Sequence, residues 1–268
     1  MKAWRFYAFG DMRLDDIELG PCPSDHVLVE PMVVQPSVTE AQLAFGIPTL
    51  AYENIKSRLE TDAPIQLFGH EFCARILEVG SAVTGYAPGD RVAARAKLPC
   101  GDCSMCNSER GNDCRRGPII GFQLPGCFAE RALLPAISLV KVDDRISDSE
   151  AATLQSLSDS IAGVETAQIR PGESVAVFGQ GSMGIESMQA ARACGAGRLI
   201  TVDVRDEACK LSLELGADYA INAKNDDPIE VIRDLTDGEG ADVVFECAGG
   251  SVKQGLAGDK ALKQAMHA

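Results

Sequence analysis

The chain has 268 residues, of which 46% are hydrophobic, and a formal net charge of −14 at pH 7. This length can bury a substantial core and usually makes two domains, while the acidic balance argues against nucleic acid and anionic membrane surfaces as partners. The N-terminal residues lack the apolar core of a signal peptide, and no apolar run approaches the length of a membrane span. We therefore expect a cytoplasmic protein without membrane contact, whose ten cysteines stay reduced.

The pattern of predicted elements changes near residue 150. Residues 1 to about 150 read as short strands broken by Gly and Pro, which predicts a compact domain resembling a β-barrel. From residue 151 onward, strands and helices alternate, which predicts a parallel α/β sheet. We expect strands at 174–179, 198–203, 218–221 and 242–247, and helices at about 182–194, 206–215 and 227–236.

Four cysteines in a loop-like stretch of the first domain follow the pattern C-x2-C-x2-C-x7-C: Cys100, Cys103, Cys106 and Cys114. Thiolates at this spacing can converge on one tetrahedral zinc ion, in a closed structural site that holds a loop and performs no chemistry. Disulfides, an iron–sulfur cluster and coincidence are the alternatives, and the sequence on either side favours zinc. We assign this zinc lobe to residues of about 97–117.

A glycine-rich motif, G-x-G-x-x-G, directly follows an apolar strand and opens a helix, the context that a dinucleotide-binding loop requires. Gly179 permits the tight turn, Gly181 lets the backbone approach the pyrophosphate, and Gly184 lets helix and strand pack closely. Ser182 and Met183 complete the loop. The start of the helix then presents unpaired N–H groups and a positive dipole end to the phosphates.

The residue at the end of the second strand of this domain predicts the choice of cofactor. Asp203 lies 24 residues after Gly179, where a carboxylate accepts a hydrogen bond from a ribose 2′-hydroxyl and repels a 2′-phosphate. Arg205 could instead receive that phosphate. We therefore expect NAD, with NADP as the less favoured alternative.

These motifs, together with G-H-E at 69–71, E-V-G at 78–80 and P-G-D-R-V at 88–92, stand in an order that resembles the zinc-containing medium-chain dehydrogenases. This family includes the alcohol, sorbitol, butanediol and threonine dehydrogenases, and the resemblance covers nearly the whole chain. It implies an α/β protein with a GroES-like β-barrel domain over 1–150 and a Rossmann NAD-binding domain over 151–268. Because four strands and a last helical stretch over 259–268 do not complete a six-stranded dinucleotide fold, we expect a truncated Rossmann domain.

The resemblance also implies a catalytic centre. In the zinc alcohol dehydrogenases a second zinc polarises the substrate oxygen, and a nearby hydroxyl carries the alcohol proton while hydride passes to the nicotinamide. His70 and Glu71 match the family's G-H-E motif, and Thr39 matches the hydroxyl that carries the proton. Glu40 matches the carboxylate that orients the ligand histidine.

The family's metal pattern breaks at two positions. Ser37 stands where the family has a cysteine ligand, and a hydroxyl is a poor replacement for a thiolate. Gln155 stands where the sorbitol-type branch has a carboxylate. The two losses together favour a pocket without the catalytic zinc, in which His70 is hydrogen-bonded to Glu40.

Three functions follow from these patterns. The first is an NAD-dependent oxidoreductase that transfers hydride between nicotinamide and a small-molecule substrate, either a secondary alcohol, a polyol or an amino alcohol, or the matching ketone. The second is a metal-free nicotinamide-dependent biosynthetic reductase or redox-assisted elimination enzyme, and the third is a non-catalytic dinucleotide-binding module. A fold supports many functions, so the site must decide between them. By resemblance, we expect a homodimer or homotetramer.

Overall fold

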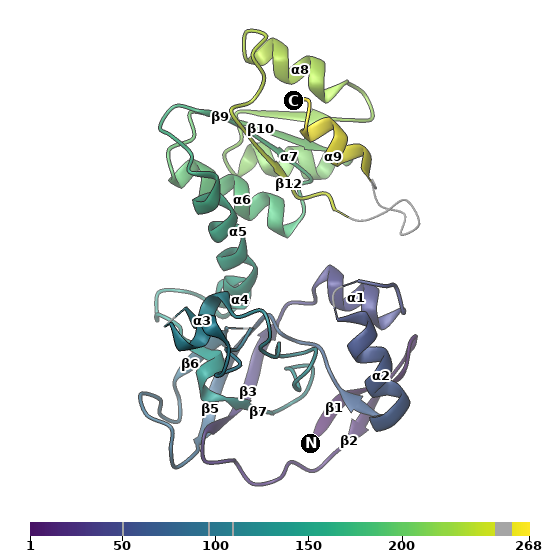
Figure 1. Ribbon diagram of the computed structural model, residues 1–268, viewed down its shortest axis with the longest axis vertical. Helices are drawn as coiled ribbons and strands as arrows, with labels where there is room; N and C mark the ends of the chain where they lie inside the picture. Colours follow the sequence, from purple (N-terminus) through teal and green to yellow (C-terminus); the bar gives the residue numbers. More distant parts are fainter. Residues whose placement is uncertain (50, 96, 109, 250–258) are drawn as a thin grey trace. The chain divides into compact units, whose positions relative to one another are not determined.

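The computed structural model describes residues 1–49, 51–95, 97–108, 110–249 and 259–268, and it divides into two compact units (Figure 1). The first unit is Met1–Gln155 and the second is Ser156–Ala268. The domain boundary predicted near residue 150 lies close to this division. In the described ranges, no helix has both the length and the apolar character needed to cross a membrane.

The described part of the first unit contains two antiparallel sheets. One sheet has the strand order β2-β1-β4 and the other has the order β7-β3-β5-β6-β8. The strands are β1 (Lys2–Ala8), β2 (Asp11–Asp16), β3 (His26–Val34), β4 (Ile65–Gln66), β5 (Phe72–Val79), β6 (Arg91–Ala94), β7 (Ala132–Pro135) and β8 (Leu139–Lys141).

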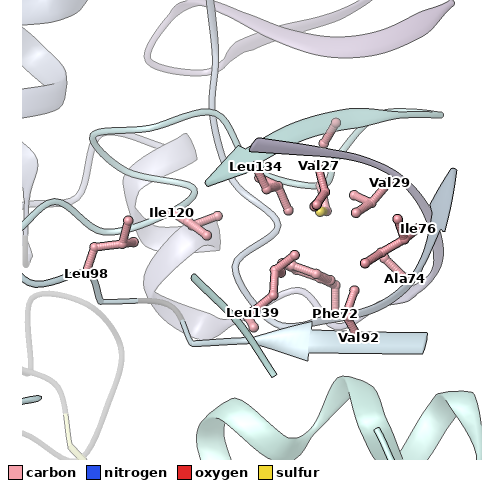
Figure 2. Close-up of a cluster of buried hydrophobic side chains, with 13 residues drawn as sticks. Val27, Val29, Phe72, Ala74, Ile76, Val92, Leu98, Ile120, Leu134 and Leu139 are labelled. Atoms are coloured by element: carbon pink, nitrogen blue, oxygen red, sulfur yellow. The ribbon is translucent and has the colours of Figure 1, made fainter. Parts of the chain in front are cut away.

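The core of the larger sheet follows from the period-two alternation of its strands. Val27 and Val29 of β3 and Phe72 and Ile76 of β5 point toward one another, with Leu134 of β7 closing the cluster (Figure 2). These side chains are 0–1% exposed, so this cluster fixes the register of the strands. The short helices of the unit are α1 (Val38–Ala44), α2 (Tyr52–Asp62), α3 (Ser104–Asn107) and α4 (Asp148–Ala152), with two 3₁₀ turns at Gly111–Asp113 and Ala136–Ser138.

The described part of the second unit contains a parallel sheet of the order β11-β10-β9-β12. The strands are β9 (Ser174–Phe178), β10 (Arg198–Asp203), β11 (Tyr219–Asn222) and β12 (Val243–Glu246). The helices are α5 (Leu154–Ala167), α6 (Ser182–Ala193), α7 (Asp206–Glu214), α8 (Pro228–Leu235) and α9 (Asp259–Ala265). The predicted strands and helices of this unit are confirmed to within about two residues, a normal spread for element ends.

The sheet of the second unit is covered on both faces, and its strand β9 is apolar from Val175 to Phe178. Val175 and Val177 of β9 pack with Met188 of α6, whereas Ala176 and Phe178 belong to the cluster on the opposite face. All five residues of β9 are buried. This two-sided burial is typical of a doubly wound α/β fold, and it places the end of β9 directly before the glycine-rich loop.

Candidate functional site

The four cysteines of the predicted zinc lobe converge in space, and their sulfur atoms all lie within 4.8 Å of one another. Cys103 Sγ lies 3.5 Å from Cys106 Sγ and 3.8 Å from Cys114 Sγ, and Cys100 Sγ lies 3.9 Å from Cys106 Sγ. A tetrahedron of sulfurs around zinc, with Zn–S bonds of about 2.3 Å, requires S···S separations of about 3.8 Å. The four thiols therefore fit a tetrahedral zinc ion, and none of these pairs is at the disulfide distance of about 2.05 Å.

Hydrogen bonds shift the pKa values of two of the four thiols in opposite directions. The Cys100 N–H donates to Cys114 Sγ at 3.3 Å and lowers the pKa of Cys114 to about 6, which favours the thiolate that binds metal. The Cys100 thiol donates to Asp102 Oδ1 at 2.8 Å, which raises the pKa of Cys100 to about 12. Arg116 in turn donates to both oxygens of Asp102.

Three of the predicted catalytic residues, Glu40, His70 and Glu71, form a buried chain of polar contacts around the imidazole. Its Nδ1 lies 2.6 Å from Glu40 Oε1, and its Nε2 lies 3.5 Å from Glu71 Oε1. Gln35 Nε2 donates to Glu71 Oε2 at 2.5 Å. The ring of Phe122 packs 4.9 Å from the imidazole, centroid to centroid. The imidazole is therefore held between two carboxylates and against one apolar wall.

The backbone of the G-H-E motif holds Glu40, which is only 2% exposed. The N–H groups of Gly69 and His70 donate to Glu40 Oε1 at 2.7 and 3.3 Å. Phe68 and Gly69 both have positive φ, 65° and 80°, and this left-handed turn directs successive N–H groups to one oxygen. A Cβ at Gly69 would lie 2.7 Å from the backbone nitrogen of Cys127, so this position requires glycine.

Ser37 caps the helix α1 and helps to hold Glu40 in this pocket. Its hydroxyl accepts the N–H of Glu40 at 3.1 Å, and Glu40 Oε2 accepts the N–H of Ser37 at 3.1 Å, which together form the capping box that begins α1. Thr39 follows in the first turn of α1 and is half-buried. Gln155, in the first turn of α5, is the last residue of the first unit.

The donors of the histidine pocket do not fit a second, catalytic zinc. Such a site needs three protein ligands and one open position. His70 and Glu71 offer two donors, and the third family position is the Ser37 hydroxyl, which is neutral and already caps α1. Throughout the residues that the structure describes, the four cysteines are the only group of three or more His, Cys, Asp or Glu side chains close enough to hold one metal ion.

The glycine-rich loop of the second unit has the close packing that a dinucleotide cradle requires. Gly179 has φ +86°, and a Cβ there would overlap the backbone of Ala248. A Cβ at Gly184 would overlap the carbonyl of Gly179. Gly181 is the N-cap of α6, and Ser182 is its first residue. The N-cap position therefore carries no side chain between a pyrophosphate and the N–H groups of the first turn.

Asp203 closes β10 beside this loop and is heavily hydrogen-bonded. Its carboxylate accepts the N–H of Gln180 at 2.7 Å and the N–H of Arg205 at 3.0 Å. The Arg205 guanidinium donates to both of its oxygens, at 3.0 and 3.2 Å. Burial works to raise the pKa of Asp203, but the hydrogen bonds from Arg205 and Gln180 outweigh burial and lower it. Asp203, which was predicted to favour NAD, and Arg205, which could receive the phosphate of NADP, are therefore hydrogen-bonded to each other.

Sequence reasoning missed two residues of the histidine pocket, Gln35 and Phe122. Gln35 reaches Glu71 because pairing of β3 with β5 continues past Val34, with the Gln35 N–H donating to the Glu71 carbonyl at 2.9 Å. The sequence carries no local signal for this register. Phe122 lies in the segment after the zinc lobe, more than 50 residues from His70 along the chain.

The two units, one with a four-cysteine loop and one with a glycine-rich loop after a parallel strand, define a dinucleotide-binding α/β protein. Family models agree, since residues 23–144 match the alcohol dehydrogenase GroES-like domain and residues 182–258 match the zinc-binding dehydrogenase domain. The NAD-dependent alcohol dehydrogenase of Sulfurisphaera tokodaii is 32% identical over 249 residues, which are 92% of this chain and 71% of that protein. The chain belongs to the zinc-containing medium-chain dehydrogenase family.

Other relatives match a smaller part of their own length. The L-threonine 3-dehydrogenase of Bacillus licheniformis is 34% identical over 194 residues, which are 72% of this chain and 55% of that protein. The chain thus spans about half the length of the first curated relatives it matches. Among solved structures, a zinc-binding dehydrogenase from Sinorhizobium meliloti 1021 bound to NADP has a TM-score of 0.85 and 28% identity, over 99% of this chain and 72% of that one. The 2R,3R-butanediol dehydrogenase of Bacillus subtilis has a TM-score of 0.80 and 26% identity, over 99% and 73%.

Proposed function

We propose that the protein is a nicotinamide-dependent oxidoreductase that transfers hydride between the cofactor and a small secondary alcohol, polyol or amino alcohol, or the matching ketone. The observation that carries this proposal is the glycine-rich cradle at the start of α6, with Asp203 beside it. The names of the relatives, which are threonine, sorbitol, alcohol and butanediol dehydrogenases, support the substrate class. Assembly as a homodimer or homotetramer is part of the same proposal and rests on the family resemblance.

In this proposal the second unit binds and orients the dinucleotide, which supplies hydride transfer when bound. The N–H groups at the start of α6 bind the pyrophosphate. Asp203 accepts a hydrogen bond from a ribose hydroxyl, which favours NAD, and Arg205 would have to leave Asp203 to receive a 2′-phosphate. Zinc held by the four cysteines keeps the lobe folded and has no open position for substrate.

Side chains of the first unit accept and donate the proton of the substrate hydroxyl. Thr39 carries this proton at its Oγ1, and His70 with Glu71 receives it at the imidazole edge that faces away from Glu40. Glu40 holds the imidazole in place through Nδ1, and Gln35 holds Glu71. No step passes through a second zinc, because the pocket lacks its third ligand.

The capping role of Ser37 favours a second candidate, the metal-free reductase or redox-assisted elimination enzyme. A substrate carbon next to a carbonyl is already activated, so its reaction needs a positioned acid or base more than it needs a Lewis acid. Activity that survives a strong chelator, with the four-cysteine zinc still bound, would favour this candidate over zinc-assisted alcohol oxidation.

The test is turnover with NAD across a panel of alcohols and ketones, combined with calorimetric measurement of NAD affinity. Thr39→Val and His70→Ala should each abolish turnover and leave the Kd for NAD within about twofold, because both side chains belong to the first unit. Unchanged rates in these variants would refute the roles assigned to Thr39 and His70. NAD binding without turnover across the whole panel would point to the non-catalytic module.

A further inference from the structure

A half-buried carboxylate that the proposed reaction does not use lies in the second unit, on the face of α6 that contacts α5. Ser156 Oγ donates to Glu186 Oε1 at 2.8 Å, and Ser160 Oγ donates to Glu186 Oε2 at 3.1 Å. The two serines are only 4% and 2% exposed. Each oxygen of Glu186 therefore has a buried hydroxyl partner, and the side chain has a fixed position between the two helices.

The same contact reaches the glycine-rich loop. Ser160 Oγ also lies 3.5 Å from the carbonyl oxygen of Met183 and 3.7 Å from its sulfur. Met183 is the second residue of α6, so one hydroxyl of α5 touches both the first turn of α6 and Glu186, in the next turn. These contacts all lie within the second unit. They hold in place the turn whose N–H groups would face a pyrophosphate.

Glu186 also places a negative charge near that turn. It lies five residues after the N-cap Gly181, which is about 7.5 Å along the axis of an α-helix. A unit charge at about 7.5 Å from a phosphate charge weakens binding about threefold in a water-like dielectric, and about fortyfold at the effective dielectric constant of about 20 found near protein surfaces. The charge on Glu186 therefore opposes the anion that the start of α6 attracts.

Burial raises the pKa of the Glu186 carboxyl, the serine hydrogen bonds partly offset this rise, and the nearby charge of Asp159 adds to it. On the sheet side, Cys247 Sγ lies 3.9 Å from the hydroxyl of Ser187, and burial raises the pKa of its thiol as well. Asp159 of α5 is thus the charged neighbour that acts on Glu186, whereas the Cys247 thiol contacts the adjacent residue Ser187. Protonation on acidification begins at a higher pH for Glu186 than for an exposed glutamate.

We propose that Glu186 is a positioning residue that sets the affinity of the dinucleotide site. It is fixed by Ser156 and Ser160, of which Ser160 also contacts the first turn of α6, and its negative charge weakens pyrophosphate binding. This inference rests on the proposed dinucleotide function of the loop. The neutral, isosteric Gln side chain can keep a partner for both serines and removes the charge. The inference therefore predicts a gain of affinity from Glu186→Gln, which a purely structural contact would not give.

The experiment is calorimetric measurement of the Kd for NAD at pH 8 and pH 6, on the full chain and its variants. Glu186→Gln should bind NAD at least about threefold tighter than the wild type at pH 8. Any tightening of the wild type on going from pH 8 to pH 6 should be absent in the variant, because only the wild type carries a carboxyl whose raised pKa brings protonation to higher pH. Glu165→Gln removes the same charge from an exposed position on α5, is the matched control and should behave like the wild type. Ser160→Ala should weaken binding at both pH values, because it frees the first turn of α6.

Two results would overturn the inference. If the wild type binds NAD but Glu186→Gln binds equally or more weakly at pH 8, with circular dichroism showing an unchanged fold, the charge of Glu186 does not oppose the cofactor. This outcome would leave the proposed function intact. If the wild type does not bind NAD at all, the proposed function and the inference fall together.

Discussion

The buried capping box at the start of α1 allows a sharp test of how the histidine pocket is held. Glu40 Oε1 accepts three N–H groups, from Gly69, from the His70 backbone and from His70 Nδ1, and its Oε2 accepts the N–H of Ser37. Glu40→Gln places an amide NH2 where one of these oxygens now accepts. If the NH2 replaces Oε2, it faces the N–H of Ser37. If it replaces Oε1, it faces the three N–H groups of Gly69 and His70. In either case a buried N–H group loses its acceptor.

The expected loss of stability can be worked from these contacts. An unsatisfied buried donor costs about 1–3 kcal/mol, and charged hydrogen bonds are about twice as strong as the neutral ones that replace them. Together these effects predict that Glu40→Gln lowers the free energy of unfolding by about 3 kcal/mol, or the Tm by about 6–12 °C for a chain of this size. Urea unfolding followed by the fluorescence of Trp4, the only tryptophan, would report on the first unit.

The same motif occurs a second time on the surface and provides the control. Glu150 forms a capping box with Ser147 at the start of α4 and is exposed. Since water can replace its hydrogen bonds, Glu150→Gln should cost less than about 1 kcal/mol. Equal effects of Glu40→Gln and Glu150→Gln would refute the view that burial and the left-handed turn at Phe68 and Gly69 make Glu40 the anchor of the pocket.

Three further predictions concern the cofactor loop and the zinc lobe. Because the folded-state pKa of Asp203 is lowered, its contribution to stability is present above its unfolded pKa of about 4 and is lost as pH falls through the folded value. Asp203→Asn should therefore destabilise at pH 7, and unfolding curves should show the difference shrinking as the pH falls below about 4. Gly184→Ala should abolish NAD binding measured by calorimetry, because the added methyl overlaps the Gly179 carbonyl, and wild-type affinity would contradict this packing. Cys114→Ser should lower the thermal unfolding midpoint and remove zinc from the purified protein, and retention of a full zinc equivalent would argue against the four-cysteine site.

The sequence predicts those features in which local pattern determines structure. The apolar runs that became β9 and β10, and the glycines at the start of α6, predict the second unit because strand burial and turn geometry are local. The spacing of the four cysteines is sufficient to predict their convergence for the same reason, since Cys100 and Cys114 are only 14 residues apart.

Contacts that depend on long-range pairing were not predictable in this way. Ser37 reads as a lost metal ligand, and only the structure shows that its hydroxyl caps α1 and helps to hold Glu40. Gln35 meets Glu71 because β3 and β5 pair over 36 residues of separation. Glu186 has the polarity of an ordinary surface residue, and it is the packing of α5 on α6 that buries half of it against two serines.

The most direct test of this account is the number of zinc ions per chain, measured by elemental mass spectrometry on the purified full chain. We expect one zinc ion per chain, held by Cys100, Cys103, Cys106 and Cys114, and none in the Cys114→Ser variant. Two zinc ions per chain, with one lost in His70→Ala, would show that the histidine pocket binds a catalytic metal despite Ser37 and would contradict the account.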